Sequence, residues 1–396
     1  MNPNSDIKQG RATIFLLAAI AALGSLATQL LVPALPLLAH DLHASASDAQ
    51  LVIGVFLIHL GVGQLLAGPL ADRWGRKPVL LAGLALYCLG SAAAAMAGSL
   101  ALLLMARALQ ALGASAGIIT ARVLVSDLFA ASEAMSAQAT LMAVVLISPA
   151  LAPVIGGTLT ELIGWRAIFA VLAVAGLLGA GMAWASLPEG RAPSANAARP
   201  GLRGSYALLL KNRAFLGAAM AITGGSSALY MFLGTAPFLL AHQHHLSPRQ
   251  IGLCLLLVAV MSIIATFAVK RVERRGNALL LGSVISASGG FALLALAIAG
   301  MTGLAAFIGP MLLLGLGAGL IGPSGITRVM RALPGLEGTA ASLAGAAQML
   351  IGALATYALG LFAPVSALHL GAAIALTTGA AVFAATLGGK PAARTM

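Results

Sequence analysis

Stretches of about 20 mainly apolar residues recur along the whole chain, and each is long enough to cross a lipid bilayer. Of the 396 residues, 60% are hydrophobic and only 8% are charged, whereas soluble domains carry roughly 25% charged residues. Most of the surface must therefore face lipid. In lipid each backbone polar group needs a partner within the protein, and the alternating pattern of a barrel is absent, so the stretches are predicted to be helices.

The apolar stretches number twelve, which predicts an all-α integral membrane protein of twelve transmembrane helices. The predicted spans are 13–38, 51–70, 78–97, 101–122, 137–160, 167–187, 214–240, 250–269, 278–299, 303–326, 336–361 and 366–388.

The net charge of +12 does not indicate nucleic-acid binding, because the basic residues lie in short gaps between spans. Lys and Arg concentrate in the cytoplasmic loops of membrane proteins. With the N-terminus inside, the outer loops hold only Arg166 and Arg249, and all other loop Lys and Arg residues are cytoplasmic. We therefore expect both termini to be cytoplasmic.

Residues 188–213 form the one long polar gap, rich in Pro, Gly, Ala and Arg, which is typical of a flexible linker. The expected organisation is an N-terminal six-helix half (1–187), a cytoplasmic linker (188–213) and a C-terminal six-helix half (214–396). A weak repeat supports a duplication. Asp72-Arg73-Trp74-Gly75 follows span two, and Glu273-Arg274-Arg275-Gly276 follows span eight.

No cofactor or metal is expected. Cys88 and Cys254 lie inside spans and are interpreted as small apolar residues. His242, His244 and His245 share one outer loop, but without carboxylate partners they are weak evidence for a metal site. The first span is too long for the core of a cleaved signal peptide and is expected to stay as an anchor.

The segment 68–77, GPLADRWGRK, resembles the loop signature that follows the second helix in the major facilitator superfamily. In that family this loop latches one conformation of the transporter. The resemblance implies conformational roles for Gly68, Asp72, Arg73, Gly75 and Arg76. Asp72 could accept hydrogen bonds from the N-terminal amides of a helix, where negative charge is favoured.

Two further motifs are similar to those of the same family. Residues 107–113 resemble its Arg-x-x-Gln-Gly element, with Ala111 where Gly is usual. Residues 148–157, SPALAPVIGG, resemble the antiporter motif of exporters, with Ala152 where Gly is usual. The motif residues are Arg107, Gln110, Pro149, Pro153, Gly156 and Gly157.

Finer details resemble the Bcr/CflA branch of drug:proton antiporters. They are residues 32–36 (VPALP), residues 121–129, which include Arg122, and residues 236–238 (APF). The branch resemblance implies a bacterial inner-membrane protein that works as a monomer.

One position departs from that branch. An Asp usually stands four residues before the first Pro of Leu-Pro-Ala-Leu-Pro, but here that position is Gln29, which carries no proton. By the predicted spans, every Asp and Glu lies in a loop or at a helix end. The ionisable groups left inside are Arg107 and His59. An embedded Arg costs roughly 2.5–3.5 kcal/mol and so marks a functional candidate.

His exchanges protons near neutral pH, so His59 is a candidate to replace the missing acid in proton coupling. The alternative is a neutral histidine with a hydrogen-bond partner on a buried face.

The substrate cavity is expected at the bilayer midplane between the halves. The residues expected to line the substrate and proton pathway are Gln29, Leu30, Pro33, His59, Arg107, Gln110, Tyr230, Phe232, Gln348 and Met349. Aromatic, Met and amide side chains suit neutral or anionic amphipathic molecules, and core packing is the alternative for each aromatic residue.

Three functions follow as alternatives. The first is export of small amphipathic compounds, such as antibiotics, in exchange for protons. The second is export or facilitated passage of a metabolite without proton coupling, which Gln29 favours. The third, a membrane-embedded enzyme, would need a catalytic constellation facing one aqueous pocket, and the lack of deep carboxylates argues against it.

Overall fold

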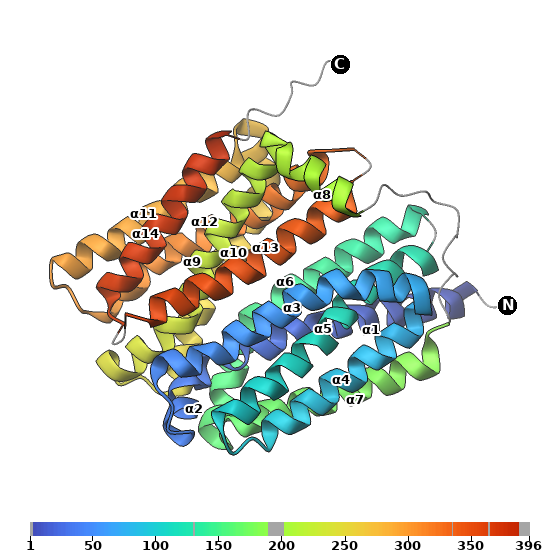
Figure 1. Ribbon diagram of the computed structural model, residues 1–396, viewed down its shortest axis with the longest axis horizontal. Helices are drawn as coiled ribbons and strands as arrows, with labels where there is room; N and C mark the ends of the chain where they lie inside the picture. Colours follow the sequence, from blue (N-terminus) through green and yellow to red (C-terminus); the bar gives the residue numbers. More distant parts are fainter. Residues whose placement is uncertain (1–2, 130, 189–201, 335, 363–364, 388–396) are drawn as a thin grey trace. The chain divides into compact units, whose positions relative to one another are not determined.

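The computed structural model describes residues 3–129, 131–188, 202–334, 336–362 and 365–387. Within some helices the side chains are not described, including those of residues 3–11, Asp72 and Pro149. The described chain is helical throughout apart from short connections (Figure 1). It divides into two compact units, Met1–Ala197 with Ser247–Gly252, and Ala198–Leu246 with Leu253–Met396.

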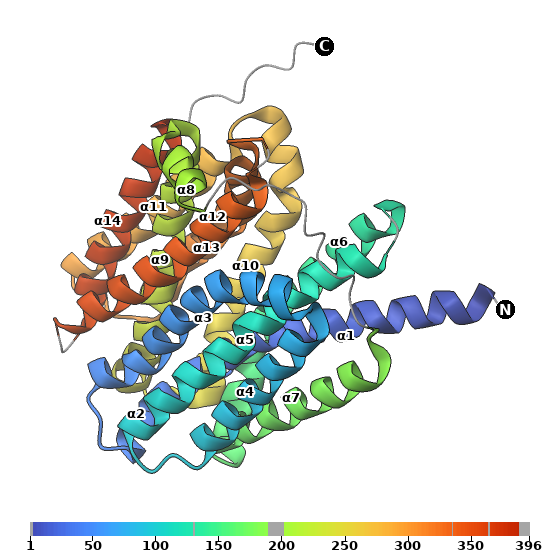
Figure 2. The ribbon, with the colours of Figure 1, turned by 45° about the vertical axis from the view of Figure 1, so that its right-hand side comes forward.

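The first unit is a bundle in which α4 packs on α5 and α7, and α3 packs on α5 (Figures 1 and 2). Its elements are α1 Pro3–Gln29, the 3₁₀ turn η1 Val32–Ala34, α2 Leu35–Asp41, α3 Ala46–Trp74, α4 Arg76–Ala95, α5 Leu100–Leu128, α6 Ala131–Leu162 and α7 Arg166–Ser186.

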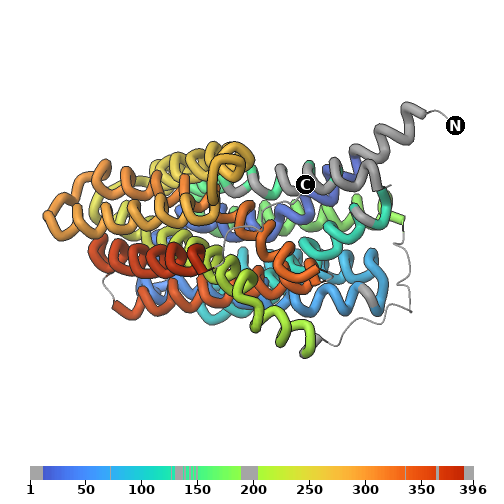
Figure 3. The backbone as a smooth tube through the Cα atoms, turned by 90° about the horizontal axis from the view of Figure 1, so that it is seen from above, coloured from blue at the N-terminus to red at the C-terminus, as the bar shows by residue number. Residues whose placement is uncertain are grey.

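The second unit repeats this arrangement, with α11 packed on α12 and α14, and α9 packed on α13 and α14. The axes of its long helices run roughly parallel in Figure 3, and the short helix α8 lies at an angle to them. The elements are α8 Leu202–Lys211, α9 Arg213–His244, α10 Pro248–Arg275, α11 Ala278–Ile298, α12 Leu304–Arg331, α13 Glu337–Gly360 and α14 Ala367–Leu387.

Four of the described helices begin with a side-chain cap. Side-chain oxygens of Ser45, Ser99, Asn212 and Asn277 each accept a hydrogen bond from the amide three residues on, which pairs one of the free N–H groups of the first turn. The α3–α4 connection is the single residue Gly75, whose φ of 94° is a backbone conformation that favours glycine.

Small residues allow adjacent helices to approach closely. Gly83 of α4 faces the Gly113 carbonyl of α5, and a side chain at either position would collide with the partner backbone. In the second unit Gly282 of α11 and Gly317 of α12 meet in the same way. Such contacts drive helix association where lipid removes the usual hydrophobic force.

The twelve-helix prediction is confirmed. Eleven described helices are long and apolar enough to cross a membrane, and the shorter apolar segment Ala150–Leu162 within α6 supplies the twelfth. The helices extend several residues beyond the predicted spans at most ends.

The predicted span 13–38 lies within one membrane-spanning stretch, Ala12–Asp41. Inside this stretch α1 ends at Gln29, and the 3₁₀ turn η1 leads into α2, an interruption that was not predicted from the sequence. The predicted linker 188–213 also contains the helix α8, while its residues 189–201 lie outside the described residues. The domain boundaries at 187 and 214 stay a prediction.

Candidate functional site

The interruption of the first span leaves backbone carbonyls inside the first unit without their helical hydrogen-bond donors. Proline has no N–H, so Pro33 cannot bond the carbonyl of Gln29 four residues back. The amide of Leu31 donates to Thr28 in a tighter turn, and the Ala27 carbonyl therefore lacks its usual helical donor. A buried carbonyl without a donor is costly, so another group must supply one.

Arg107 of α5 is that donor. Its Nη1 lies 3.1 Å from the Ala27 carbonyl oxygen, and its Nε lies 3.2 Å from the Val52 carbonyl oxygen of α3. The guanidinium also lies 4.0 Å from the ring centre of Phe56. The end of a helix carries partial negative charge, and an aromatic face attracts a cation. These contacts solvate a side chain that is 0% exposed.

A chain of hydrogen bonds continues from Arg107 to α4. Nη1 donates to Gln110 Oε1 at 2.6 Å, Gln110 Nε2 donates to Ser91 Oγ at 2.8 Å, and Ser91 donates to the Tyr87 carbonyl at 2.7 Å. All four side chains are buried. We call Arg107, Gln110 and Ser91 the polar cluster. The cluster is rigid, since each member has a directed partner.

No carboxylate among the described side chains neutralises Arg107. Its Nη2 has no hydrogen-bond partner in the described part of the chain. The described acidic side chains all lie exposed at helix ends: Asp41, Asp48, Asp127, Glu161, Glu273 and Glu337. The cluster therefore holds a positive charge that only neutral groups compensate.

The antiporter-like motif, on α6, also contacts the interruption between α1 and α2. A side chain at Gly156 of α6 would collide with the Leu30 carbonyl, and so only glycine permits this approach. Ser25 of α1 and Ser148 of α6 add a hydrogen bond at 3.3 Å. Two of the predicted motifs thus converge on residues 27–30.

The same helix also holds the start of α10. Gly157 faces the backbone of Pro248, and Gly252 faces the backbone of Pro153. Ser247 donates a hydrogen bond of 3.0 Å to the Glu161 carboxylate. Residues 247–252 accordingly belong to the first compact unit. The C-terminal part of the antiporter-like motif therefore contacts the start of α10 through backbone atoms, and glycines on both helices permit this approach.

The loop signature lies at the other end of the first unit. Arg76 Nε lies 3.5 Å from Asp127 Oδ2 at the end of α5. Lys77 donates to the carbonyls of Trp184 and Leu187 at the end of α7. Arg73 is exposed, and the side chain of Asp72 is outside the described residues. Gly68 faces open space, and Arg122 is exposed on α5.

His59 lies half-buried on α3, two turns along from Val52. Its Nδ1 is 2.8 Å from the Val55 carbonyl. A carbonyl only accepts, so Nδ1 carries the hydrogen and Nε2 remains as the atom that can take up a proton. Gln29 is also half-buried, whereas Leu30 and Pro33 are buried. Their contact with substrate stays a prediction.

The pathway residues that were predicted in the second unit do not all lie in one environment. Tyr230 of α9 donates to Met349 Sδ of α13 at 3.4 Å, and Gln348 is half-buried beside it in sequence. Phe232 instead is 0% exposed and packs against Phe307, with ring centres 6.4 Å apart. It belongs to the apolar core of its unit in this structure.

Sequence reasoning missed Phe56, Ser91, Ser25 and the carbonyls of Ala27 and Val52. A lone Ser or Phe in an apolar span carries no distinguishing pattern. The sequence did carry a signal for an interruption nearby, because Pro33 and Pro36 remove the helical donors of the Gln29 and Val32 carbonyls.

A family model for the Major Facilitator Superfamily matches residues 17–356. The chain belongs to the major facilitator superfamily and is a multi-pass membrane transporter of that family. As the motifs and helix order implied, it has the twelve-helix fold of this superfamily.

Relatives place the chain near resistance proteins. It is 30% identical over 338 residues to Multidrug resistance protein D of Escherichia coli (strain K12), covering 85% of each chain. It is 31% identical to the Chloramphenicol resistance protein of Pseudomonas aeruginosa, covering 80% of this chain and 77% of that one. It is 25% identical to the Bicyclomycin resistance protein homolog of Haemophilus influenzae, covering 86% and 87%. These relatives confirm the resemblance to the Bcr/CflA branch.

Solved structures agree on the fold alone. A bacterial homolog of the human lysosomal transporter Spinster, inward-facing and occupied, matches with a TM-score of 0.78 at 14% identity over 96% of each chain. A D-xylose-proton symporter matches with a TM-score of 0.76 at 18% identity over 95% of this chain and 97% of that one.

Proposed function

We propose that this transporter exports small amphipathic, antibiotic-like compounds in exchange for protons, by alternating access in a bacterial inner membrane. The observation that carries the proposal is the convergence of Arg107 and Gly156 on the break at Gln29. Interrupted membrane helices near the bilayer midplane form the binding sites of many transporters. The resistance relatives support the direction of transport.

Both termini are proposed to be cytoplasmic. In the second unit the last turns of α10 and α12 gather Lys270, Arg271, Arg274, Arg275, Arg328 and Arg331 at one end. Basic residues favour the cytoplasmic side, so this end is assigned to the cytoplasm.

The polar cluster orients the first span rather than binding the compound directly. Arg107 is fully buried, so a substrate does not reach it directly. Its hydrogen bond to the Ala27 carbonyl instead orients the turn that carries Gln29. The accessible groups of this region are the half-buried Gln29 and His59. We propose that these two meet substrate or proton, with Leu30, Pro33 and Gln110 fixing their backbone.

His59 is proposed as the group that carries the proton. Its Nδ1 is fixed by Val55, so a proton gained at Nε2 creates a full positive charge in the same unit as Arg107. The substrate class follows from the same charge: neutral or anionic compounds are favoured over lipophilic cations.

The alternative is export or facilitated passage without proton coupling. Gln29 favours it, since an amide at the position of the usual acid cannot carry a proton. The two functions share the same binding residues and differ only in the response to a pH gradient.

The test uses purified protein in liposomes and radiolabelled chloramphenicol, a neutral amphipathic probe. Counterflow with uphill movement that needs an imposed pH gradient supports the proposal, and His59→Gln should then abolish the uphill component but keep counterflow. His242→Gln, at an exposed position ending α9, is the control. Counterflow indifferent to the gradient establishes the alternative instead. If His59→Gln retains uphill export, His59 does not carry the proton.

A further inference from the structure

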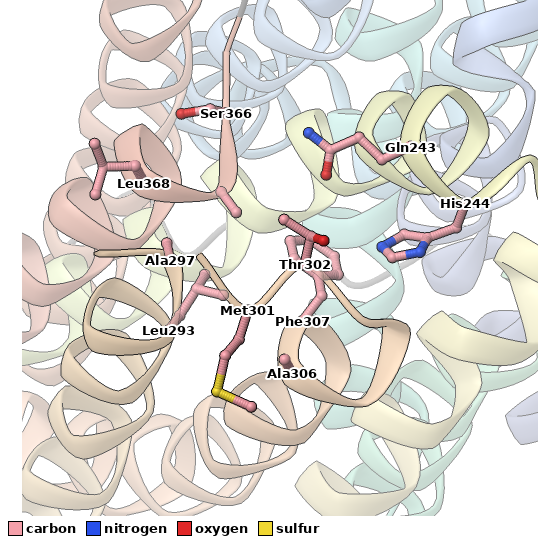
Figure 4. A pocket seen from close by; sticks show the side chains of 11 residues that line it. Gln243, His244, Leu293, Ala297, Met301, Thr302, Ala306, Phe307, Ser366 and Leu368 are labelled. Atoms are coloured by element: carbon pink, nitrogen blue, oxygen red, sulfur yellow. The ribbon is translucent and has the colours of Figure 1, made fainter. Parts of the chain in front are cut away.

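The second unit contains a cavity of about 140 Å³ at the end opposite its basic helix ends. The end of α9, the end of α11, the start of α12 and the start of α14 surround it. Figure 4 shows Gln243 and His244 on one side, Leu293 and Ala297 on the other, and Thr302 with Phe307 between them. Every lining residue belongs to this one unit. The cavity is thus distinct from the polar cluster.

The size of the cavity matches one aromatic ring. A cavity of roughly 150 Å³ lined by Leu, Ile and Phe stays dry and binds benzene. Here the buried Leu293 and Phe307 supply an apolar floor, the exposed Met301 lies at its edge, and Ala297 and Ala306 leave the space open. An aromatic ring is therefore a suitable occupant of the floor.

The rim offers hydrogen bonds that nothing in the described chain uses. Gln243 and Thr302 are both exposed at the mouth of the cavity, and neither side chain bonds to another described residue. Ser366, by contrast, is committed to capping α14, where its Oγ accepts from the amide of His369 at 3.4 Å. The free rim groups together provide a donor and an acceptor for a hydroxyl.

The lining also selects against charge. None of its eleven residues is acidic, Lys or Arg, and His244 is the one titratable member. A cation entering an apolar wall would lose its water without gaining a counter-charge. We propose that this cavity is a binding site for neutral single-ring aromatic alcohols, with the ring against Phe307 and Leu293 and the hydroxyl at Gln243 and Thr302.

The test is ¹⁹F NMR of 4-fluorophenol with the full protein in lipid nanodiscs, after subtraction of empty nanodiscs. The site predicts saturable binding. Ala306→Leu fills the cavity from α12 and should weaken binding at least tenfold. The matched control is Ala305→Leu, which adds the same volume at an exposed neighbour that does not line the cavity and should bind as wild type. Thermal unfolding of each variant checks that it is folded.

A second variant and a pair of competitors keep the test decisive. Ala297→Leu fills the cavity from α11 and should reproduce the loss. Benzyl alcohol should displace the probe, and benzyltrimethylammonium should not. The proposal is overturned if 4-fluorophenol only partitions into lipid, if both filled variants bind as wild type, or if the ammonium compound competes as well as the alcohol. None of these readouts depends on transport.

Discussion

The two halves of the molecule share a framework but differ in the chemistry of one buried layer. Gly90 of α4 packs against the backbone of Ala106 and Gln110, and Gly289 of α11 packs against that of Pro310 and Leu314 in the same way. This correspondence makes Met311 the counterpart of Arg107 and Leu314 the counterpart of Gln110. Both apolar counterparts are 0% exposed.

The difference shows that a six-helix half does not need a buried cation to fold. The second half fills the layer with Met311 and Leu314, which need no hydrogen bonds. The first half keeps Arg107 despite a cost of roughly 2.5–3.5 kcal/mol for an Arg in the membrane. The polar cluster is therefore explained by its hold on the broken first span, which the second half lacks: α9 runs unbroken from Arg213 to His244.

The largest expected effect comes from moving the cation into the second half. Met311→Arg buries a charge where no broken helix offers a free carbonyl, and an uncompensated buried charge costs about 3–5 kcal/mol. We expect the protein to fail to accumulate or to unfold at much lower temperature in detergent, whereas Met311→Leu stays close to wild type. A Met311→Arg protein as stable as wild type would show that the two halves solvate a cation equally well.

An intermediate effect on stability is expected when Gly156 or Gly352 is replaced by alanine, and the two losses should differ. Gly156 meets the backbone of Leu30, while Gly352 of α13 meets the ring of Tyr230. A ring can turn aside and a carbonyl cannot, so Gly156→Ala should cost roughly 1–3 kcal/mol and Gly352→Ala clearly less. Thermal unfolding of the two variants measures the difference. Gly54→Ala, at a site with open space, serves as the neutral control. Equal losses at 156 and 352 would contradict the account.

The smallest effect concerns two ion pairs at corresponding helix ends, which use opposite signs in the two halves. In the first half, Arg76 at the start of α4 pairs with Asp127 near the end of α5. In the second half, Glu273 near the end of α10 pairs with Arg328 of α12 at 2.7 Å and also accepts from the Ala278 amide. Partly exposed pairs contribute about 0.2–1 kcal/mol.

We therefore expect Arg328→Gln to lower the unfolding temperature only slightly, and less in high salt, because salt screens the pair. A double-mutant cycle with Glu273→Gln measures the coupling. A coupling well above 1 kcal/mol would mean that the pair is more than a surface contact.

Much of the fold was predictable from sequence because lipid imposes strong constraints. The number and length of the apolar stretches predicted twelve helices, and the motif residues Arg107 and Gly156 both contact residues 27–30. The break after Gln29 was missed because an apolar stretch looks continuous to a hydropathy argument, although Pro33 forbids one of its hydrogen bonds.

The partners of Arg107 could not be predicted. Two of them are carbonyls of Ala27 and Val52, and backbone atoms leave no trace in side-chain identity. Phe232 illustrates the opposite failure, since an aromatic residue expected beside substrate instead packs on Phe307 inside its own unit. Helix α8 was hidden for a third reason: its ten residues are too short and too polar to be distinguished from the linker around them.

The central claim is that the polar cluster orients the first span for transport, and Arg107→Met tests it most directly. This change gives the first half the residue of the second. It removes a buried charge but also removes the donor to the acceptors of Ala27, Val52 and Gln110. Loss of a donor costs about 1–3 kcal/mol, which the relief of charge burial partly offsets. We predict a protein that unfolds within a few degrees of wild type yet shows no chloramphenicol counterflow in liposomes. A folded Arg107→Met protein with wild-type counterflow would contradict the account.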